Sequence, residues 1–80
     1  MKIEILGMGC PKCKKLYENT QVAVKEANLQ VEVVKVKDIQ KIMDYGIMTT
    51  PAIAIDGEVK AAGRIPASDE IKQWIFAKEG

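Results

Sequence analysis

Residues 2–13 read KIEILGMGCPKC, and the pattern changes twice within this stretch. The apolar residues of 3–6 form a short run rich in isoleucine, which is typical of a β-strand. Gly7 and Gly9 interrupt the run, so a loop is expected after it. Pro11 suits the first position of a helix, because the N–H that proline lacks would have had no partner there. The stretch therefore predicts a strand, a loop and the start of a helix.

The following segment has the spacing of a long helix and then the alternation of a strand. Side chains at helical spacing predict a helix from Pro11 to about Asn28. Residues 31–37 alternate valine with charged residues, which predicts an edge strand that its charges protect from further pairing. The helical stripe consists of Cys13, Leu16, Tyr17, Thr20, Val24 and Ala27.

Two more helices and a hairpin are expected. Asp38 is a good N-cap and Gly46 can end a helix in the left-handed conformation, with Ile39, Ile42 and Met43 as the apolar stripe between them. Pro51 then opens an apolar strand, and Asp56-Gly57 is among the strongest signals for a hairpin turn. Ser68 is expected to cap a final helix whose apolar face consists of Ile71, Trp74 and Ile75.

The order β-α-β-α-β-β-α indicates an α/β fold. Two strands joined through a long helix should be parallel with a right-handed crossover, and the hairpin completes a mixed four-stranded sheet with helices on both faces. We expect a single domain over residues 1–80, because a core divided between shorter segments could not offset the entropy of ordering them. Function in such sheets lies at the carboxyl ends of strands, where residues 7–13 fall.

Charge and hydropathy narrow the classes of partner. Twelve basic and eleven acidic residues leave a net charge of +1. Such a chain lacks the positive electrostatic potential that attracts a phosphate backbone, so we do not expect it to bind nucleic acid. The apolar runs are too short to span a bilayer, and no membrane association is expected. The N-terminus lacks the pattern of a secretory signal, so we expect a cytoplasmic protein and, in addition, a monomer.

Cys10 and Cys13 are the only cysteines, and two residues separate them. A structural disulfide would close a tiny loop and stabilise the fold little. At a helix start the pair lies one turn apart, so a reversible disulfide is geometrically reasonable. In a cytoplasmic chain the same spacing indicates redox or metal chemistry.

We assign Cys10 as the nucleophile and Cys13 as the resolving thiol. Unpaired N–H groups and the positive end of the helix dipole favour a thiolate at Cys10, so the pKa of Cys10 should be depressed. Cys13 begins the apolar stripe and should be less accessible, which suits attack on a mixed disulfide held at Cys10. Basic residues that add to the effect are Lys12, Lys14 and Lys15.

Two other interpretations apply to these cysteines. They can be small core residues that happen to be close. Buried structural cysteines, however, do not need a glycine before them, a proline between them or lysines around them, so we give this interpretation little weight. Residues 7–13 also resemble the GMxCxxC loop of small copper chaperones, in which two thiolates bind Cu(I) and Met8 could be mistaken for a third ligand. Those domains end in a strand, whereas this sequence is expected to end in a helix. We therefore favour redox chemistry and keep Cu(I) binding as the alternative. Without histidine or a third cysteine, a closed zinc site within the chain is not expected.

A more specific pattern lies in the second half: Tyr45-Gly46-Ile47, Pro51, a short apolar strand, Gly57-Glu58-Val59 and Gly63. In this order the chain resembles the small archaeal and bacterial thioredoxin-like proteins also called glutaredoxin-like or redox-active disulfide protein 2. The resemblance implies a thioredoxin-like fold and a thiol-disulfide oxidoreductase without cofactors, which exchanges electrons with protein disulfides in cell redox homeostasis. It also implies an upstream reductase of the thioredoxin reductase type.

The resemblance further assigns substrate-binding residues. It implies that Pro51 is a cis-proline facing the disulfide and that the backbone of Thr50 pairs with an extended substrate segment. Gly63 resembles the glycine that thioredoxins place near the active-site surface, and Pro11 and Lys12 lie between the cysteines. Residues that could complete the rim are Met8, Met48, Thr49 and Ile65.

Two departures from related patterns matter for function. The Gly-Gly-Asp region with which glutaredoxins hold glutathione is represented only by residues 62–64, Ala-Gly-Arg, which puts glutathione use in doubt. Glu4 lies six residues before Cys10, at the offset of the buried acid of thioredoxins. Its alternation with Ile3 and Ile5 nevertheless favours an ordinary half-solvated strand residue.

Overall fold

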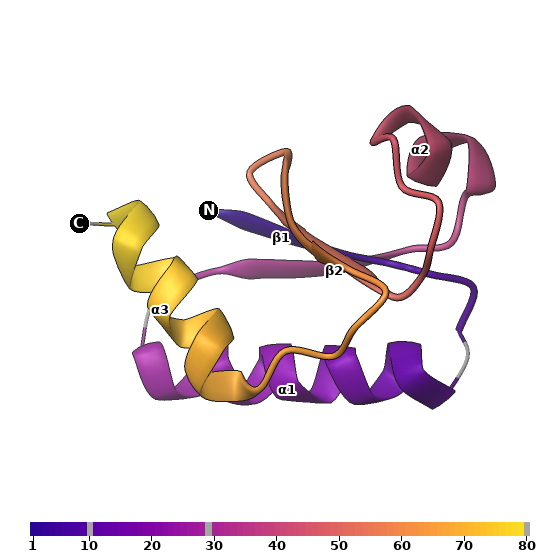
Figure 1. The fold of residues 1–80 in the computed structure, drawn as a ribbon. Coiled ribbons are helices and arrows are strands. Elements are labelled where there is room, and N and C mark those ends of the chain that lie inside the picture. Colours follow the sequence, from indigo (N-terminus) through magenta and orange to yellow (C-terminus); the bar gives the residue numbers. More distant parts are fainter. Residues whose placement is uncertain (10, 29, 80) are drawn as a thin grey trace.

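The helices and strands follow one another in the order that the sequence predicts (Figure 1). The computed structural model describes residues 1–9, 11–28 and 30–79. Its strands are β1 (Lys2–Leu6), β2 (Glu32–Val36), β3 (Ala52–Ile55) and β4 (Glu58–Ala62). Its helices are α1 (Pro11–Ala27), α2 (Ile39–Asp44) and α3 (Ser68–Glu79). Within the described residues no helix is long and apolar enough to cross a membrane.

The strands form one mixed sheet in the order β2-β1-β3-β4. β1 pairs in parallel with β2, with Leu6 opposite Val36, and antiparallel with β3. β2 lies at an edge of the sheet, which confirms the prediction from its alternating charges. β3 and β4 form the predicted antiparallel hairpin, and the φ angles of Asp56 and Gly57 are 50° and 85°. Positive values at both positions are what a tight two-residue hairpin turn requires.

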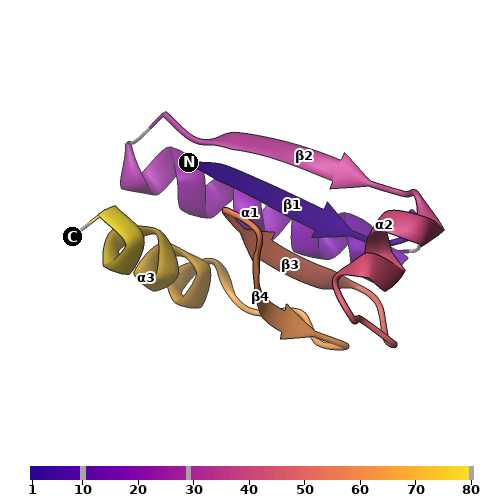
Figure 2. The ribbon, with the colours of Figure 1, turned by 90° about the horizontal axis from the view of Figure 1, so that it is seen from above.

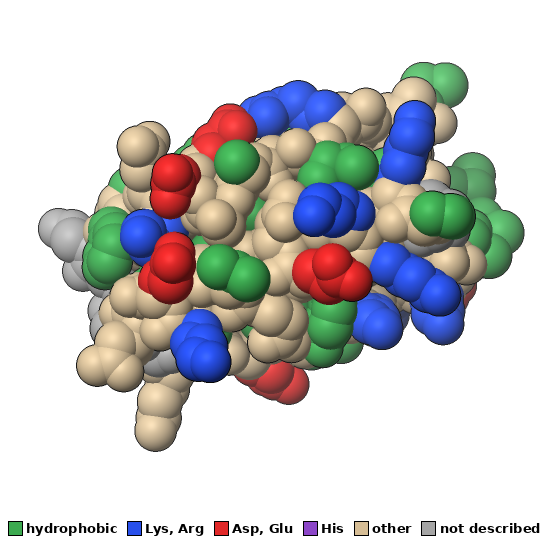
Figure 3. Space-filling view, turned by 90° about the horizontal axis from the view of Figure 1, so that it is seen from below, with side chains coloured by type: hydrophobic (Ala, Val, Ile, Leu, Met, Phe, Trp, Pro, Cys, Tyr) green, Lys and Arg blue, Asp and Glu red, His purple; other side chains and the backbone are tan. Residues whose placement is uncertain are grey.

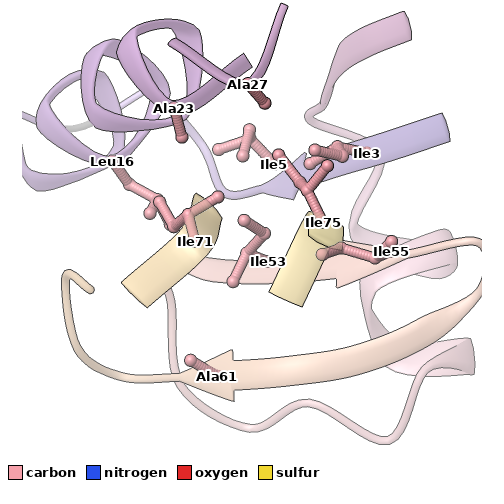
Figure 4. Close-up of a cluster of buried hydrophobic side chains, with 10 residues drawn as sticks. All are labelled: Ile3, Ile5, Leu16, Ala23, Ala27, Ile53, Ile55, Ala61, Ile71 and Ile75. Atoms are coloured by element: carbon pink, nitrogen blue, oxygen red, sulfur yellow. The ribbon is translucent and has the colours of Figure 1, made fainter. Parts of the chain in front are cut away.

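α1 and α3 cover one face of the sheet and form the main core with it (Figures 1 and 2). Alternate residues of a strand face the same side, so the isoleucines of β1 and β3 all point toward these two helices (Figure 4). The buried residues of this main cluster are Ile3, Ile5, Leu16, Ala23, Ala27, Ile53, Ile55, Ala61, Ile71 and Ile75.

α2 covers part of the opposite face, near the carboxyl ends of β1 and β2 (Figures 1 and 2). The prediction of helices on both faces is therefore confirmed. All four residues of β3 are buried, because both of its faces are covered, which explains its continuously apolar sequence. The second cluster consists of Leu6, Val36, Ile42, Ile47, Ala52 and Ala54.

The short helix α2 buries less than its sequence pattern suggested. Asp38 caps it as predicted, because its side chain accepts a hydrogen bond from the Gln40 N–H at 2.9 Å. Ile42 is buried, whereas Ile39 and Met43 are 56% and 61% exposed. A helix of six residues at the end of the sheet brings only one of the three stripe residues into the core.

The start of α3 differs from the prediction by one residue. Ser68 is the first helical residue, not the cap, and the Ala67 carbonyl accepts the Ile71 N–H at 3.1 Å. The buried Pro66 fixes this entry, because its carbonyl accepts a hydrogen bond from Asn19 Nδ2 of α1 at 3.1 Å.

Candidate active site

The loop between β1 and α1 lies at the carboxyl end of β1, where the sequence predicted a functional site. The Gly7 N–H donates a hydrogen bond to the Val36 carbonyl at 3.0 Å, which extends the parallel ladder beyond β1 and holds the end of β2 beside the loop. Pro11 begins α1 as predicted, and both Pro11 and Lys12 are exposed. Cys10 lies outside the described residues.

Cys13 is buried in the first turn of α1, with 6% of its surface exposed. Its sulfur lies against Gly7: a Cβ on Gly7 would be 2.4 Å from Cys13 Sγ and 3.9 Å from the Cα of Pro51. Real Cβ atoms essentially never approach another atom within 3.0 Å, so only glycine fits here without displacement. Gly7, the Cys13 sulfur and Pro51 at the entrance of β3 therefore lie close together.

Pro51 is the third residue of this arrangement. It is buried, and the Thr50–Pro51 peptide bond is cis, as the resemblance implied. The Gly63 N–H donates a hydrogen bond to the Pro51 carbonyl at 2.9 Å. Gly63 has a φ of 77°, which favours glycine, and a Cβ there would lie 2.7 Å from Thr49 Oγ1, so the Thr49 side chain would have to move. The fold thus brings Thr50, Pro51 and Gly63 together.

The expected rim residues divide into two groups. Met8 and Met48 are 58% and 97% exposed and present thioether side chains to solvent. Thr49 is exposed as well and contacts the position of Gly63 described above. Ile65 instead packs against the main core cluster, so its contribution is to the interior.

A pocket of about 70 Å³ opens beside Cys13. Lys14 of α1 lines it together with Lys35 of β2 and Lys37, which follows β2. Of the lysines that the sequence placed near the thiols, only Lys14 lines this pocket, whereas Lys12 and Lys15 do not. The remaining lining residues are Ile5, Gly7, Gly9 and Cys13.

Sequence reasoning missed Lys35 and Lys37 as residues of the site. A signal was present, because the carboxyl ends of adjacent parallel strands meet at the same edge of a sheet. Residues 34–37, VKVK, end the strand expected to pair with β1. Their basic side chains therefore belong beside the loop that follows β1.

The positions of two of these lysines are defined by their neighbours. Lys35 Nζ lies 4.4 Å from the centroid of the Tyr17 ring, a cation–π geometry. Lys37 lies over Gly9, since a Cβ on Gly9 would be 3.7 Å from Lys37 Cε and 3.8 Å from Nζ. On the α1 side of the molecule, basic side chains gather toward the end where α1 begins (Figure 3).

Glu4 is half-buried, as expected, but it has a partner that the sequence did not reveal. The Tyr45 hydroxyl donates a short hydrogen bond to its carboxylate. This bond, together with burial and the charge of Glu4, raises the pKa of Tyr45. Because Ile3 and Ile5 face α1, Glu4 faces the opposite side of the sheet from Cys13. Its offset from Cys10 therefore does not bring its carboxylate to the Cys13 thiol.

A metal site would need several carboxylate, thiol or imidazole side chains close together in the part of the chain that the structure describes. No group of three or more such side chains within residues 1–9, 11–28 and 30–79 is arranged to hold a metal ion.

Comparison with known proteins agrees with this geometry. The family model described as a thioredoxin domain matches residues 1–76. A thioredoxin from Methanothermobacter thermautotrophicus is 41% identical over 75 residues, which cover 94% of this chain and 97% of that protein. A thioredoxin from Methanocaldococcus jannaschii is 42% identical over 73 residues, or 91% of this chain and 84% of the relative. The chain therefore belongs to the thioredoxin domain family, which confirms the predicted fold and the class of thiol-disulfide oxidoreductase.

Proposed function

We propose that this chain reduces disulfide bonds of protein substrates through Cys10 and Cys13. The observation that carries the proposal is the Cys13 sulfur buried against Gly7, with Pro51 also beside that glycine. A buried thiol of this kind is poorly placed to meet a large substrate first. It is well placed to attack a mixed disulfide held at a neighbouring cysteine, and Cys10 is the other cysteine of the chain.

In the proposed cycle, the Cys10 thiolate attacks one sulfur of the substrate disulfide. That disulfide breaks, its other sulfur leaves as a thiolate that takes up a proton, and a mixed disulfide joins Cys10 to the substrate. Cys13 then gives up its proton and attacks the Cys10 sulfur, which releases the second substrate thiol. Two electrons pass to the substrate, and a reductase of the thioredoxin reductase type returns two electrons to the Cys10–Cys13 disulfide.

Exposed residues around the thiols provide the proposed docking surface. Thr50 offers backbone groups beside Pro51, and Pro11 and Lys12 are exposed at the start of α1. Gly63 leaves this surface open, because a side chain there would collide with its neighbours. An extended substrate segment that pairs with the backbone of Thr50 would bring its disulfide to the start of α1.

We also propose that the protein works as a cytoplasmic monomer of one domain, and that it does not depend on glutathione. A reducing compartment keeps such dithiols supplied with electrons. The position that follows Gly63 is occupied by Arg64, whose guanidinium bonds both Glu70 carboxylate oxygens at 3.0 and 2.6 Å. Because Arg64 is bonded to Glu70, the surface after Gly63 differs from the Gly-Gly-Asp region with which glutaredoxins hold glutathione. This difference supports a function that does not depend on glutathione.

Substrate trapping tests the proposal. Cys13→Ser should accumulate a mixed disulfide with protein targets that dithiothreitol releases, because no second thiol remains to resolve it. The matched variant Cys10→Ser should accumulate little. Equal trapping by both variants would contradict the assigned roles. Trapping by neither, together with stoichiometric Cu(I) binding by the wild type, would favour the metal alternative.

A further inference from the structure

We infer that the lysine pocket, defined as the cavity lined by Lys14, Lys35, Lys37 and Cys13, binds the acidic group of a small disulfide substrate. The acidic group is a carboxylate, sulfonate or phosphate. The inference rests on the proposed function and adds a substrate class to it: low-molecular-weight disulfides that carry negative charge, alongside protein disulfides.

The charge of the pocket is uncompensated. No acidic residue lines it, and none of its three lysines forms an ion pair with any residue in 1–9, 11–28 or 30–79. The lysines come from α1, from β2 and from the segment after β2, so the fold brings three basic side chains to the wall of one pocket. A bound anion would be attracted by these positive charges, which have no ion-pair partner among the described residues.

One of the lysine side chains is held in place before any ligand binds. Lys35 rests on the Tyr17 ring, and the Tyr17 hydroxyl in turn accepts a hydrogen bond from Gln21 Nε2 at 2.7 Å. The Lys37 side chain passes close to Gly9, where a Cβ would be 3.7 Å from Lys37 Cε. Long side chains that are already placed lose less conformational entropy when they bind a ligand.

The size of the pocket selects the ligand group. A water molecule needs roughly 10–15 Å³ of cavity volume, and the volume of this pocket is about 70 Å³. The pocket therefore has room for a group of a few heavy atoms, the size of a carboxylate or phosphate. Because Cys13 lines the same pocket, an acidic group bound there has its own disulfide within a short linker of the dithiol.

The reaction is the same exchange with a different substrate. The reduced dithiol gives two electrons to a small disulfide RSSR, and its S–S bond breaks to give two RSH. The Cys10–Cys13 disulfide forms in the protein, and the two thiol protons of the dithiol account for the two protons gained by the products. No further oxidant or reductant takes part in this half-reaction.

The test measures how fast the reduced protein is oxidised by three small disulfides that differ in charge. They are dithiodipropionate, which is anionic, hydroxyethyl disulfide, which is neutral, and cystamine, which is cationic. Each rate is divided by the rate of the same disulfide with dithiothreitol, which removes intrinsic reactivity. The wild type should then prefer the anion over the neutral compound several-fold, and the preference should weaken as salt is added.

Variants connect the preference to the pocket. Lys35→Gln and Lys37→Gln should each lower the anion-to-neutral rate ratio by roughly two- to fivefold, the effect expected of one exposed charge. Lys14→Gln and Lys15→Gln form a matched pair, because both residues are exposed neighbours on α1 and only Lys14 lines the pocket. Lys14→Gln should lower the ratio, and Lys15→Gln should leave it unchanged.

The outcomes separate this inference from the proposed function. If the wild type reduces hydroxyethyl disulfide and protein disulfides but shows no preference for the anion, the inference is wrong and the proposed function stands. The inference is also wrong, with the proposed function intact, if Lys14→Gln and Lys15→Gln change the ratio equally. If the wild type reduces none of the disulfides, both fail.

Discussion

Replacing Gly7 by alanine probes the packing between β1 and the Cys13 thiol. The added Cβ would lie 2.4 Å from Cys13 Sγ, whereas ordinary van der Waals contact begins at 3.4 Å, so the sulfur must move by about 1 Å. Cys13 is buried, and overpacking of such a site costs about 1–3 kcal/mol. We expect Gly7→Ala to lose this free energy of unfolding in urea titrations, followed by the fluorescence of Trp74.

The same displacement should slow the resolving step. In stopped-flow reduction of a chromogenic disulfide, Gly7→Ala should form the mixed disulfide normally and release the second thiol more slowly. Gly46→Ala is the control: its φ of 76° makes alanine cost about 1–2 kcal/mol, but nothing lies within 4 Å of the new Cβ. Gly46→Ala should therefore be destabilised without a change in resolution. The reasoning is refuted if Gly7→Ala keeps its stability within about 0.5 kcal/mol and resolves at the wild-type rate.

Three further outcomes are expected. Tyr45→Phe removes the hydrogen bond to Glu4 and should cost about 1 kcal/mol at neutral pH. Because the pKa of Tyr45 is raised above its ordinary value of 10.0, that stability is present below pH 10 and is lost as the pH rises through the folded-state pKa, so urea titrations should show the two proteins converging at high pH. In the reduced protein Cys10 should be alkylated faster than Cys13, which is 6% exposed, and peptide mapping that finds Cys13 labelled first would reverse their roles. Gly63→Ala should cost about 1–2 kcal/mol, because the φ of 77° at this position is unfavourable for alanine, and an unchanged unfolding midpoint would contradict this.

Local patterns were sufficient to predict the elements of the fold. The turn at Asp56 and Gly57 is specified by two residues that tolerate positive φ, and the edge position of β2 by charges along one strand. The start of α3 was misplaced because a contact distant in sequence, from Asn19 to Pro66, fixes where the chain enters the helix.

The site was predictable only in part, for the same reason. The two cysteines form a local motif, and Pro51 and Gly63 followed from the resemblance. The hydrogen bond between Glu4 and Tyr45 joins residues 41 positions apart, and the helix and strand periodicities of the sequence do not predict it. Lys37 reaches the loop after β1 through strand pairing, so its position emerges only once the order of the strands is known.

The two hydrophobic clusters on opposite faces of the sheet differ in how firmly they hold their helices. Ile71 and Ile75 anchor α3 with no exposed surface, whereas α2 has only Ile42 buried. Elements with few buried apolar contacts open at lower free energy than the core, so amide hydrogens of α2 should exchange before those of α1 and α3. The end of the sheet that α2 covers can then change its shape at low cost in free energy, while α1, which carries Cys13, keeps its position.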